Sequence, residues 1–186
     1  QECIDELADV AGVGDRVKGI TARAMNGELD FNSALIDRVG LLKDLDVGVI
    51  DRVLADRITL MPGGAALVST IRANGAYAAL VSGGFTFFTD HVRDVLGIDW
   101  TRSNVLEVQD SLLTGRLVDQ AWGDICDGAE KRRTVLEVAS LLGIDPQQCI
   151  AMGDGANDLP MMSVAGLSVA YHAKPAVREQ AMVAIN

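Results

Sequence analysis

The stretch Ala151–Pro160, AMGDGANDLP, carries three polar side chains on a turn that directly follows an apolar run. The run, Cys149–Met152, has the length and composition of a strand buried on both faces of a parallel sheet. Asp154, Asn157 and Asp158 come next, on a segment loosened by glycines. Ligands of open α/β sheets bind at the carboxyl ends of the strands. The stretch therefore predicts an α/β fold with a functional site at this turn.

Strand and helix patterns alternate on both sides of this turn, from residue 65 onward. We expect helices over 65–74, 85–96, 131–142 and 158–165, strands over 77–81, 149–152 and 167–170, and a β-hairpin formed by 103–108 and 112–118. This alternation predicts a doubly wound, Rossmann-like parallel sheet. We expect a final strand and helix of that sheet to lie beyond Asn186.

Residues 2–58 show a different pattern, with apolar residues at helical spacing in several short segments. One of these segments begins at Asp30, which is followed three residues later by Ser33, a pattern typical of a helix start. Several short helices in succession predict a small bundle. We therefore expect two domains, a helical one over 1–58 and the α/β core over 59–186.

Composition excludes several kinds of partner. The 186-residue chain is 49% hydrophobic and has a formal net charge of −10. The acidic balance argues against binding to nucleic acid or to an anionic membrane surface, and no apolar run approaches a membrane span. Cys3, Cys126 and Cys149 are widely spaced and odd in number, which favours reduced thiols in a cytoplasmic protein.

Two further segments carry chemistry that suits a phosphate group. Ser82-Gly83-Gly84 joins a strand to a helix, so its backbone N–H groups and the Ser82 hydroxyl are placed to bind phosphate oxygens; an ordinary turn of small residues is the alternative. Lys131 lies near a helix start, where an acid is more usual. It is either a phosphate contact or a solvated surface cation.

Asp154 is the candidate metal ligand. Mg²⁺ prefers oxygen ligands and usually takes one or two carboxylates, completing its shell with water and phosphate. We expect Asp158 to orient a metal-bound water and Asn157 to contact phosphate. Capping of the next helix is the alternative for Asn157 and Asp158.

These segments resemble known motifs. Ser82-Gly-Gly, Lys131 and Gly153-Asp-Gly-Ala-Asn-Asp158 are similar, in order and spacing, to motifs two, three and four of the haloacid dehalogenase-like (HAD) hydrolases. The resemblance implies a Mg²⁺ cofactor, Lys131 and Asp158 as catalytic residues, and Ser82, Gly83, Lys131 and Asn157 as contacts of the substrate phosphate.

The chain also resembles phosphoserine phosphatases nearly from end to end, through five further segments: Gln1–Glu6, Gly27–Phe31, Arg38–Leu42, Pro62-Gly63 and Tyr171–Pro175. In that family the helical insert covers the active site as a cap. The resemblance places Glu2 at the amino group of L-phosphoserine and Arg38 at its carboxylate; without it both would be interpreted as surface charges. His91 and His172 have no partner pattern and are interpreted as structural.

The first motif of the superfamily, DxDx[TV], occurs nowhere in the 186 residues. We expect it, with the nucleophilic aspartate and the first strand of the sheet, ahead of Glu2, and we expect these 186 residues to be inactive without it. The resemblance implies hydrolysis of L-phosphoserine through an aspartyl-phosphate, the last step of serine biosynthesis. The alternatives are phosphoryl transfer to another alcohol such as homoserine, and a ligand-binding fragment without turnover. A small-molecule substrate and a homodimer are the expected partners.

Overall fold

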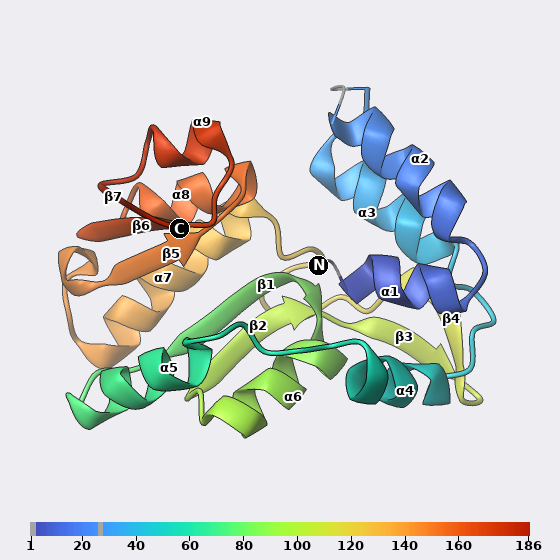
Figure 1. The fold of residues 1–186 in the computed structure, drawn as a ribbon, viewed down its shortest axis with the longest axis horizontal. Coiled ribbons are helices and arrows are strands. Elements are labelled where there is room, and N and C mark those ends of the chain that lie inside the picture. Colours follow the sequence, from blue (N-terminus) through green and yellow to red (C-terminus); the bar gives the residue numbers. More distant parts are fainter. Residues whose placement is uncertain (1–2, 26–27) are drawn as a thin grey trace. The chain divides into compact units, whose positions relative to one another are not determined.

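The computed structural model describes residues 3–25 and 28–186 and divides into two compact units, Gln1–Ile125 and Cys126–Asn186 (Figure 1). Within the described ranges, no helix combines the length and the apolar character needed to cross a membrane.

The first unit begins with the four short helices that the sequence predicts: α1 (Cys3–Val10), α2 (Gly14–Met25), α3 (Phe31–Gly40) and α4 (Gly48–Asp56). Asp30 caps α3 as predicted, because its carboxylate accepts a hydrogen bond from the backbone N–H of Ser33 at 3.0 Å. The same contact lowers the pKa of Asp30. Apolar residues of these helices, among them Leu7, Leu42 and Ile50, are fully buried in one core.

A two-stranded parallel ladder follows, made of β1 (Ala79–Phe85) and β2 (Trp100–Asn104). α5 (Gly64–Ala73) precedes β1, and α6 (Thr86–Leu96) connects β1 to β2. The strand predicted over 77–81 continues through the two glycines to Phe85, with an irregular register between Val81 and Phe85. A Cβ on Gly84 would lie 3.2 Å from Oγ of Ser82, so glycine at this position leaves room for the Ser82 hydroxyl.

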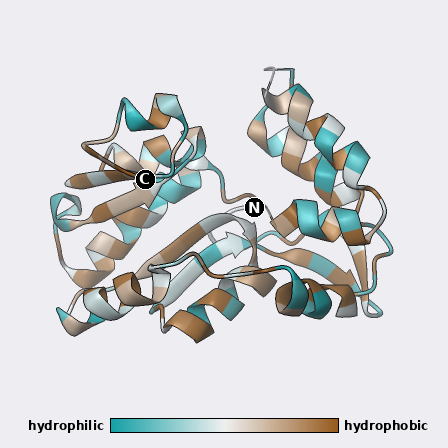
Figure 2. Cartoon of the chain, viewed as in Figure 1, coloured by the Kyte–Doolittle hydropathy of each residue, from teal (hydrophilic) through white to brown (hydrophobic). Residues whose placement is uncertain are grey.

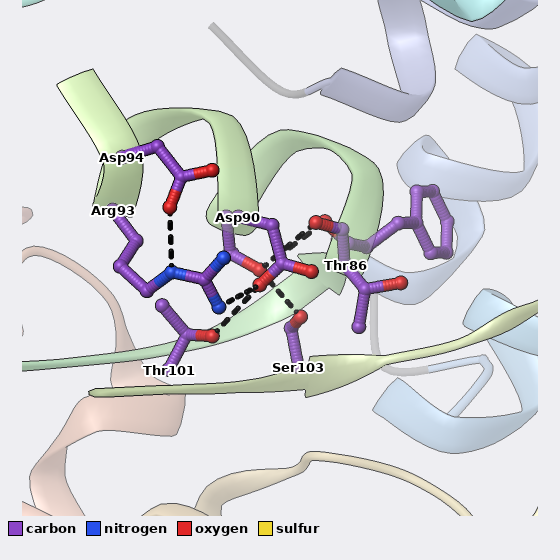
Figure 3. A network of polar contacts seen from close by, with 8 residues as sticks. Thr86, Asp90, Arg93, Asp94, Thr101 and Ser103 are labelled. Carbon is purple, nitrogen blue, oxygen red and sulfur yellow. Dashed lines mark hydrogen bonds and ion pairs between the residues drawn. The ribbon is translucent and has the colours of Figure 1, made fainter.

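β2 was missed by the sequence analysis, which assigned its last two residues to the hairpin. Its polar residues hide the pattern: Arg102 is buried, and its guanidinium carbon lies 4.8 and 5.5 Å from the ring centroids of Trp100 and Trp122. Asp90 of α6 accepts hydrogen bonds from Thr101 of β2 and from Arg93 (Figure 3). These contacts hold α6 against β2.

The predicted hairpin is present as β3 (Leu106–Gln109) and β4 (Leu112–Leu117), an antiparallel pair. Its two-residue turn, Asp110-Ser111, has positive φ at both positions, as a type I′ turn requires. The hairpin is bonded to the segment between α3 and α4, since the N–H of Asp44 donates to Leu113 O and the N–H of Leu113 donates to Leu45 O. The hairpin therefore lies with the helical segment, although the predicted boundary at residue 58 assigned it to the core; that boundary stays a prediction.

The second unit is a three-stranded parallel sheet with the order β5-β6-β7 and short helices between its strands. Hydrophobic residues dominate these strands (Figure 2). The elements are α7 (Gly128–Leu142), η1 (Pro146–Gln148), β5 (Ile150–Gly153), η2 (Ala156–Asp158), α8 (Leu159–Met162), β6 (Leu167–Tyr171), α9 (Pro175–Arg178) and β7 (Val183–Ile185).

Local signals explain α7: Asp127 caps its start by accepting from the N–H of Glu130, and Gly143 ends it at φ 66°. The helix predicted over 158–165 is shorter, one 3-10 turn and one α turn, because Asp158 turns its carboxylate back toward the preceding loop. α9 and β7 were not predicted. A four-residue helix and a three-residue exposed strand are both too short to show a periodic pattern.

The α/β class is confirmed, because the strands of the β1-β2 ladder and of the β5-β6-β7 sheet run parallel and are joined by helices. Among the described residues the parallel strands form two ladders, β1-β2 and β5-β6-β7, where the sequence predicted one sheet. The predicted first strand precedes Glu2, outside this sequence, so its pairing stays a prediction.

Candidate active site

The loop after β5 is organised by the carboxylate of Asp158. Its Oδ2 accepts two hydrogen bonds, from the backbone N–H of Asp154 at 3.0 Å and from that of Gly155 at 3.1 Å. A carboxylate that accepts from backbone N–H groups makes strong, charge-assisted bonds. Asp158 thus closes the loop on itself and fixes the backbone at Asp154. Its side chain makes no cap bond to the helix that follows, so the capping alternative for Asp158 is wrong.

The other oxygen of Asp158 forms an ion pair with Lys131, whose Nζ lies 2.7 Å from Oδ1. The side chains of Lys131 and Asp158 are only 7% and 6% exposed. The interpretation of Lys131 as a solvated surface cation is therefore wrong. Two charges at this depth stabilise the fold only when both are paired, so Lys131 and Asp158 depend on each other.

Glycines allow this close arrangement. A Cβ on Gly153 would lie 2.5 Å from both Cγ and Oδ2 of Asp158, a distance that side chains do not tolerate. A Cβ on Gly128, at the start of α7, would lie 3.0 Å from the carbonyl oxygen of Asn157. The absence of side chains at both positions lets α7 approach the loop closely enough for Lys131 to reach Asp158.

Asp154 is an exposed residue whose backbone is held by hydrogen bonds on both sides. Its N–H is bound by Asp158, and its carbonyl accepts from the N–H of Lys174 at 3.1 Å. In the described part of the chain, no three His, Cys, Asp or Glu side chains gather as a metal cluster. One carboxylate fits Mg²⁺ nevertheless, because this ion commonly takes one or two from the protein and the rest from water and phosphate.

The predicted phosphate-binding turn in the first unit has its own supports. The Ser82 hydroxyl accepts from the N–H of Gly84 at 3.0 Å, and the carbonyl of Gly83 accepts from Nδ2 of Asn104 at 2.9 Å. Asn104 is 1% exposed. Asn104 was not predicted as a site residue, because its only signal was a polar residue at the end of a strand that was not predicted.

Arg38 lies on α3 and is 7% exposed, so its interpretation as a surface charge is wrong. Its Nε donates to the carbonyl of Ala34 at 3.3 Å, a bond along its own helix. Glu2, the predicted contact of the substrate amino group, lies outside the described residues.

The predicted site residues thus form two groups. Lys131, Asp154, Asn157 and Asp158 lie together around one loop of the second unit, whereas Arg38, Ser82 and Gly83 belong to the first unit. The prediction that all of them face one crevice stays a prediction.

Several known proteins are similar to this chain in sequence. A family model described as haloacid dehalogenase-like hydrolase matches residues 9–163. A phosphoserine phosphatase of Polaromonas sp. is 63% identical over 186 residues, which is 100% of this chain and 79% of the relative. One from Albidiferax ferrireducens is 56% identical over the same 186 residues and 78% of its own length.

Solved structures of phosphoserine phosphatases are also similar to this chain. A probable phosphoserine phosphatase from Vibrio cholerae, in unliganded form, is 43% identical with a TM-score of 0.89, and the match covers 98% of this chain and 55% of that one. A substrate-bound phosphoserine phosphatase complex is 37% identical with a TM-score of 0.90 and coverages of 100% and 86%.

Proposed function

Because this chain belongs to the haloacid dehalogenase-like hydrolases and, among them, to the phosphoserine phosphatases, we propose that it hydrolyses L-phosphoserine to L-serine and phosphate. The reaction depends on Mg²⁺, passes through an aspartyl-phosphate, and completes serine biosynthesis in the cytoplasm. The nucleophilic aspartate belongs to the family motif expected ahead of Glu2.

One observation carries the proposal: the buried ion pair of Lys131 and Asp158, at 2.7 Å, on the loop that carries Asp154. It fixes an acid and a base at the end of a parallel strand, where α/β sheets bind their ligands. Phosphoryl transfer needs little covalent chemistry from the protein beyond positioning and charge stabilisation, and a fixed pair of this kind supplies both.

Each residue has a distinct role in the proposal. Asp154 would hold Mg²⁺, which supplies positive charge to the phosphoryl oxygens when bound. Lys131 neutralises a phosphoryl oxygen with its ammonium, and Asp158 keeps that ammonium in place and the loop closed. Asn157 contacts the phosphate from the same loop.

The turn in the first unit binds the phosphate with uncharged groups. The Ser82 hydroxyl and the backbone N–H of Gly83 donate to its oxygens, and Asn104 orients the peptide between Gly83 and Gly84 through the Gly83 carbonyl. The carbonyl of Gly83 and the N–H of Gly84 belong to one peptide plane, so the bonds from Asn104 and to Ser82 fix that plane before phosphate is bound.

Arg38 and Glu2 select the amino acid. The guanidinium of Arg38 suits the substrate carboxylate, because its planar fork can donate two parallel hydrogen bonds. The carboxylate of Glu2 suits the substrate ammonium. Phosphomonoesters that lack either group should therefore be poor substrates.

The first test measures phosphate release from L-phosphoserine by the full-length protein, with Mg²⁺ and with a chelator. We expect release only with the metal, and a loss of several orders of magnitude in the Asp154→Asn variant. A chain that binds phosphoserine without releasing phosphate would be a binding module and would refute the proposal. Adding homoserine and analysing the products distinguishes transfer to an alcohol from hydrolysis.

The second test concerns selectivity and uses phosphoethanolamine, which has the ammonium and the phosphate but no carboxylate. A charge-assisted hydrogen bond contributes about 1.5–3 kcal/mol, so Arg38→Met should lower kcat/KM for phosphoserine about 10- to 100-fold. The same variant should leave kcat/KM for phosphoethanolamine nearly unchanged. Equal losses on both substrates would mean that Arg38 does not bind the carboxylate.

A further inference from the structure

Asp154 is held from two sides. On one side its N–H donates to Asp158, as described above. On the other side its carbonyl accepts a hydrogen bond of 3.1 Å from the N–H of Lys174, in the turn after β6. Both peptide groups that flank the Asp154 Cα are therefore fixed, and with them the direction in which its side chain leaves the backbone.

The turn that carries Lys174 is itself anchored at both ends. At its start, the N–H of His172 donates to the carbonyl of Ile185 in β7 at 2.9 Å. At its end, the carbonyl of Lys174 accepts from the N–H of Val177 at 2.9 Å, and Val177 is buried in the core of this unit at 1% exposure. The N–H of Lys174 is consequently presented to Asp154 by a rigid support.

His172 has an unusual backbone conformation, with φ 45°. Positive φ is uncommon in residues other than glycine, although histidine tolerates it better than most. The ring of His172 packs edge-on against the ring of Tyr171, with centroids 4.5 Å apart. This left-handed residue reverses the chain after β6 so that Lys174 comes to lie beside Asp154.

We propose that the turn His172–Pro175 is a positioning element for the metal-binding carboxylate of Asp154, acting through the backbone N–H of Lys174. The proposal rests on the proposed function, because it takes Asp154 as the ligand of a divalent cation. It gives a role to a turn whose His172 was predicted to be structural. Lys174 is a positioning residue, since its backbone N–H acts through Asp154.

The backbone of Lys174 allows a specific test. Its φ of −60° and ψ of 149° are values that proline adopts, also before another proline. Lys174→Pro therefore removes the N–H that binds Asp154 while keeping the conformation of residue 174. Lys174→Ala is the matched control, because it removes the same side chain and keeps the N–H.

The probe is Mn²⁺ binding to the full-length protein, measured by electron paramagnetic resonance, with Asp154→Asn as the reference for loss of the ligand. Groups that orient a ligand typically change metal affinity 10- to 100-fold when removed, so Lys174→Pro should bind Mn²⁺ about 10-fold or more weakly than Lys174→Ala. Thermal unfolding of both variants should occur at similar temperatures. Equal affinity in two folded variants would overturn the inference.

A second pair of variants keeps the test decisive if Lys174→Pro does not fold. His172→Gly relaxes the left-handed residue and preserves the turn, whereas His172→Val places a β-branched side chain where it is strongly disfavoured. We expect the valine variant to bind Mn²⁺ several-fold more weakly than the glycine variant. Identical affinities would overturn the positioning role.

Phosphoserine hydrolysis, measured in parallel, separates this inference from the proposed function. If the parent protein releases no phosphate, the proposed function fails, while the Mn²⁺ affinities of the Lys174 variants still decide the positioning role. If Asp154→Asn binds Mn²⁺ as tightly as the parent, the positioning role fails even where phosphoserine is hydrolysed.

Discussion

The ion pair between Lys131 and Asp158 is the contact whose removal should have the largest effect on this chain. Lys131→Met keeps most of the side-chain volume and removes only the ammonium. The carboxylate of Asp158, 6% exposed, would then keep its two backbone N–H donors and lose its counter-charge. We expect a large loss of stability, because a buried charge without a partner is poorly solvated.

The expected loss of stability follows from the burial of both Lys131 and Asp158. Breaking a buried pair by removing one side costs about 3–5 kcal/mol, whereas an exposed pair is worth about 0–1 kcal/mol. Asp158→Asn should cost a similar amount, since it leaves the ammonium of Lys131 facing an uncharged amide. The double variant leaves no buried charge, so we expect its loss to be smaller than the sum of the single losses by about 2 kcal/mol or more.

The assay is urea unfolding of the full-length protein and the three variants, followed by circular dichroism, with free energies of unfolding compared at one pH and one salt concentration. Arg116→Met is the matched control. It removes a cation of the same chain from an ion pair with Glu107 in which the Arg116 side chain is 72% exposed. The control should lose less than about 1 kcal/mol.

Two outcomes would refute the reasoning. One is a loss in Lys131→Met no larger than that of the exposed control, which would mean that the pair is solvated like a surface contact. The other is additivity of the single losses within about 0.5 kcal/mol, the behaviour of independent sites. Either result would also remove the basis for assigning Asp158 the role of holding Lys131.

Three further changes have expected outcomes. Gly153→Ala places a Cβ 2.5 Å from Cγ of Asp158. It should lower the free energy of unfolding by about 1–3 kcal/mol, with a parallel fall in phosphate release. An unchanged free energy of unfolding would contradict the close approach of Asp158 to Gly153. Gly19→Ala fills open space in the exposed interior of α2 and should stabilise the chain by about 0.5–1 kcal/mol in the same assay. The hydrogen bond from Thr114 lowers the pKa of Glu107 below its ordinary 4.5. The ionised carboxylate of Glu107 therefore stabilises the folded chain above the ordinary pKa, and this stabilisation is lost as pH falls through the lowered pKa. The difference in free energy of unfolding between the parent and Glu107→Gln should shrink from about pH 7 to about pH 3.

Much of the local structure could be predicted because its causes are local. Asp30 and Asp127 cap helices through bonds to residues three positions later, and Gly143 ends a helix by adopting a left-handed conformation. The loop after β5 could be predicted for the same reason, since Asp158 binds groups only three and four residues before it. The family could be recognised because these short motifs keep their residue types and spacing.

Contacts between distant segments could be decided only by the tertiary structure. Lys131 is 27 residues from Asp158, and nothing in its immediate sequence indicates that it is buried there. The bond from Lys174 to Asp154 runs through backbone atoms, which carry no residue-specific signal. β2 was hidden because Arg102 is buried by two tryptophans, one of them far along the chain. The physical reason is common to all three: periodicity and capping depend on neighbours in sequence, whereas burial and pairing depend on which segments the folded chain brings together.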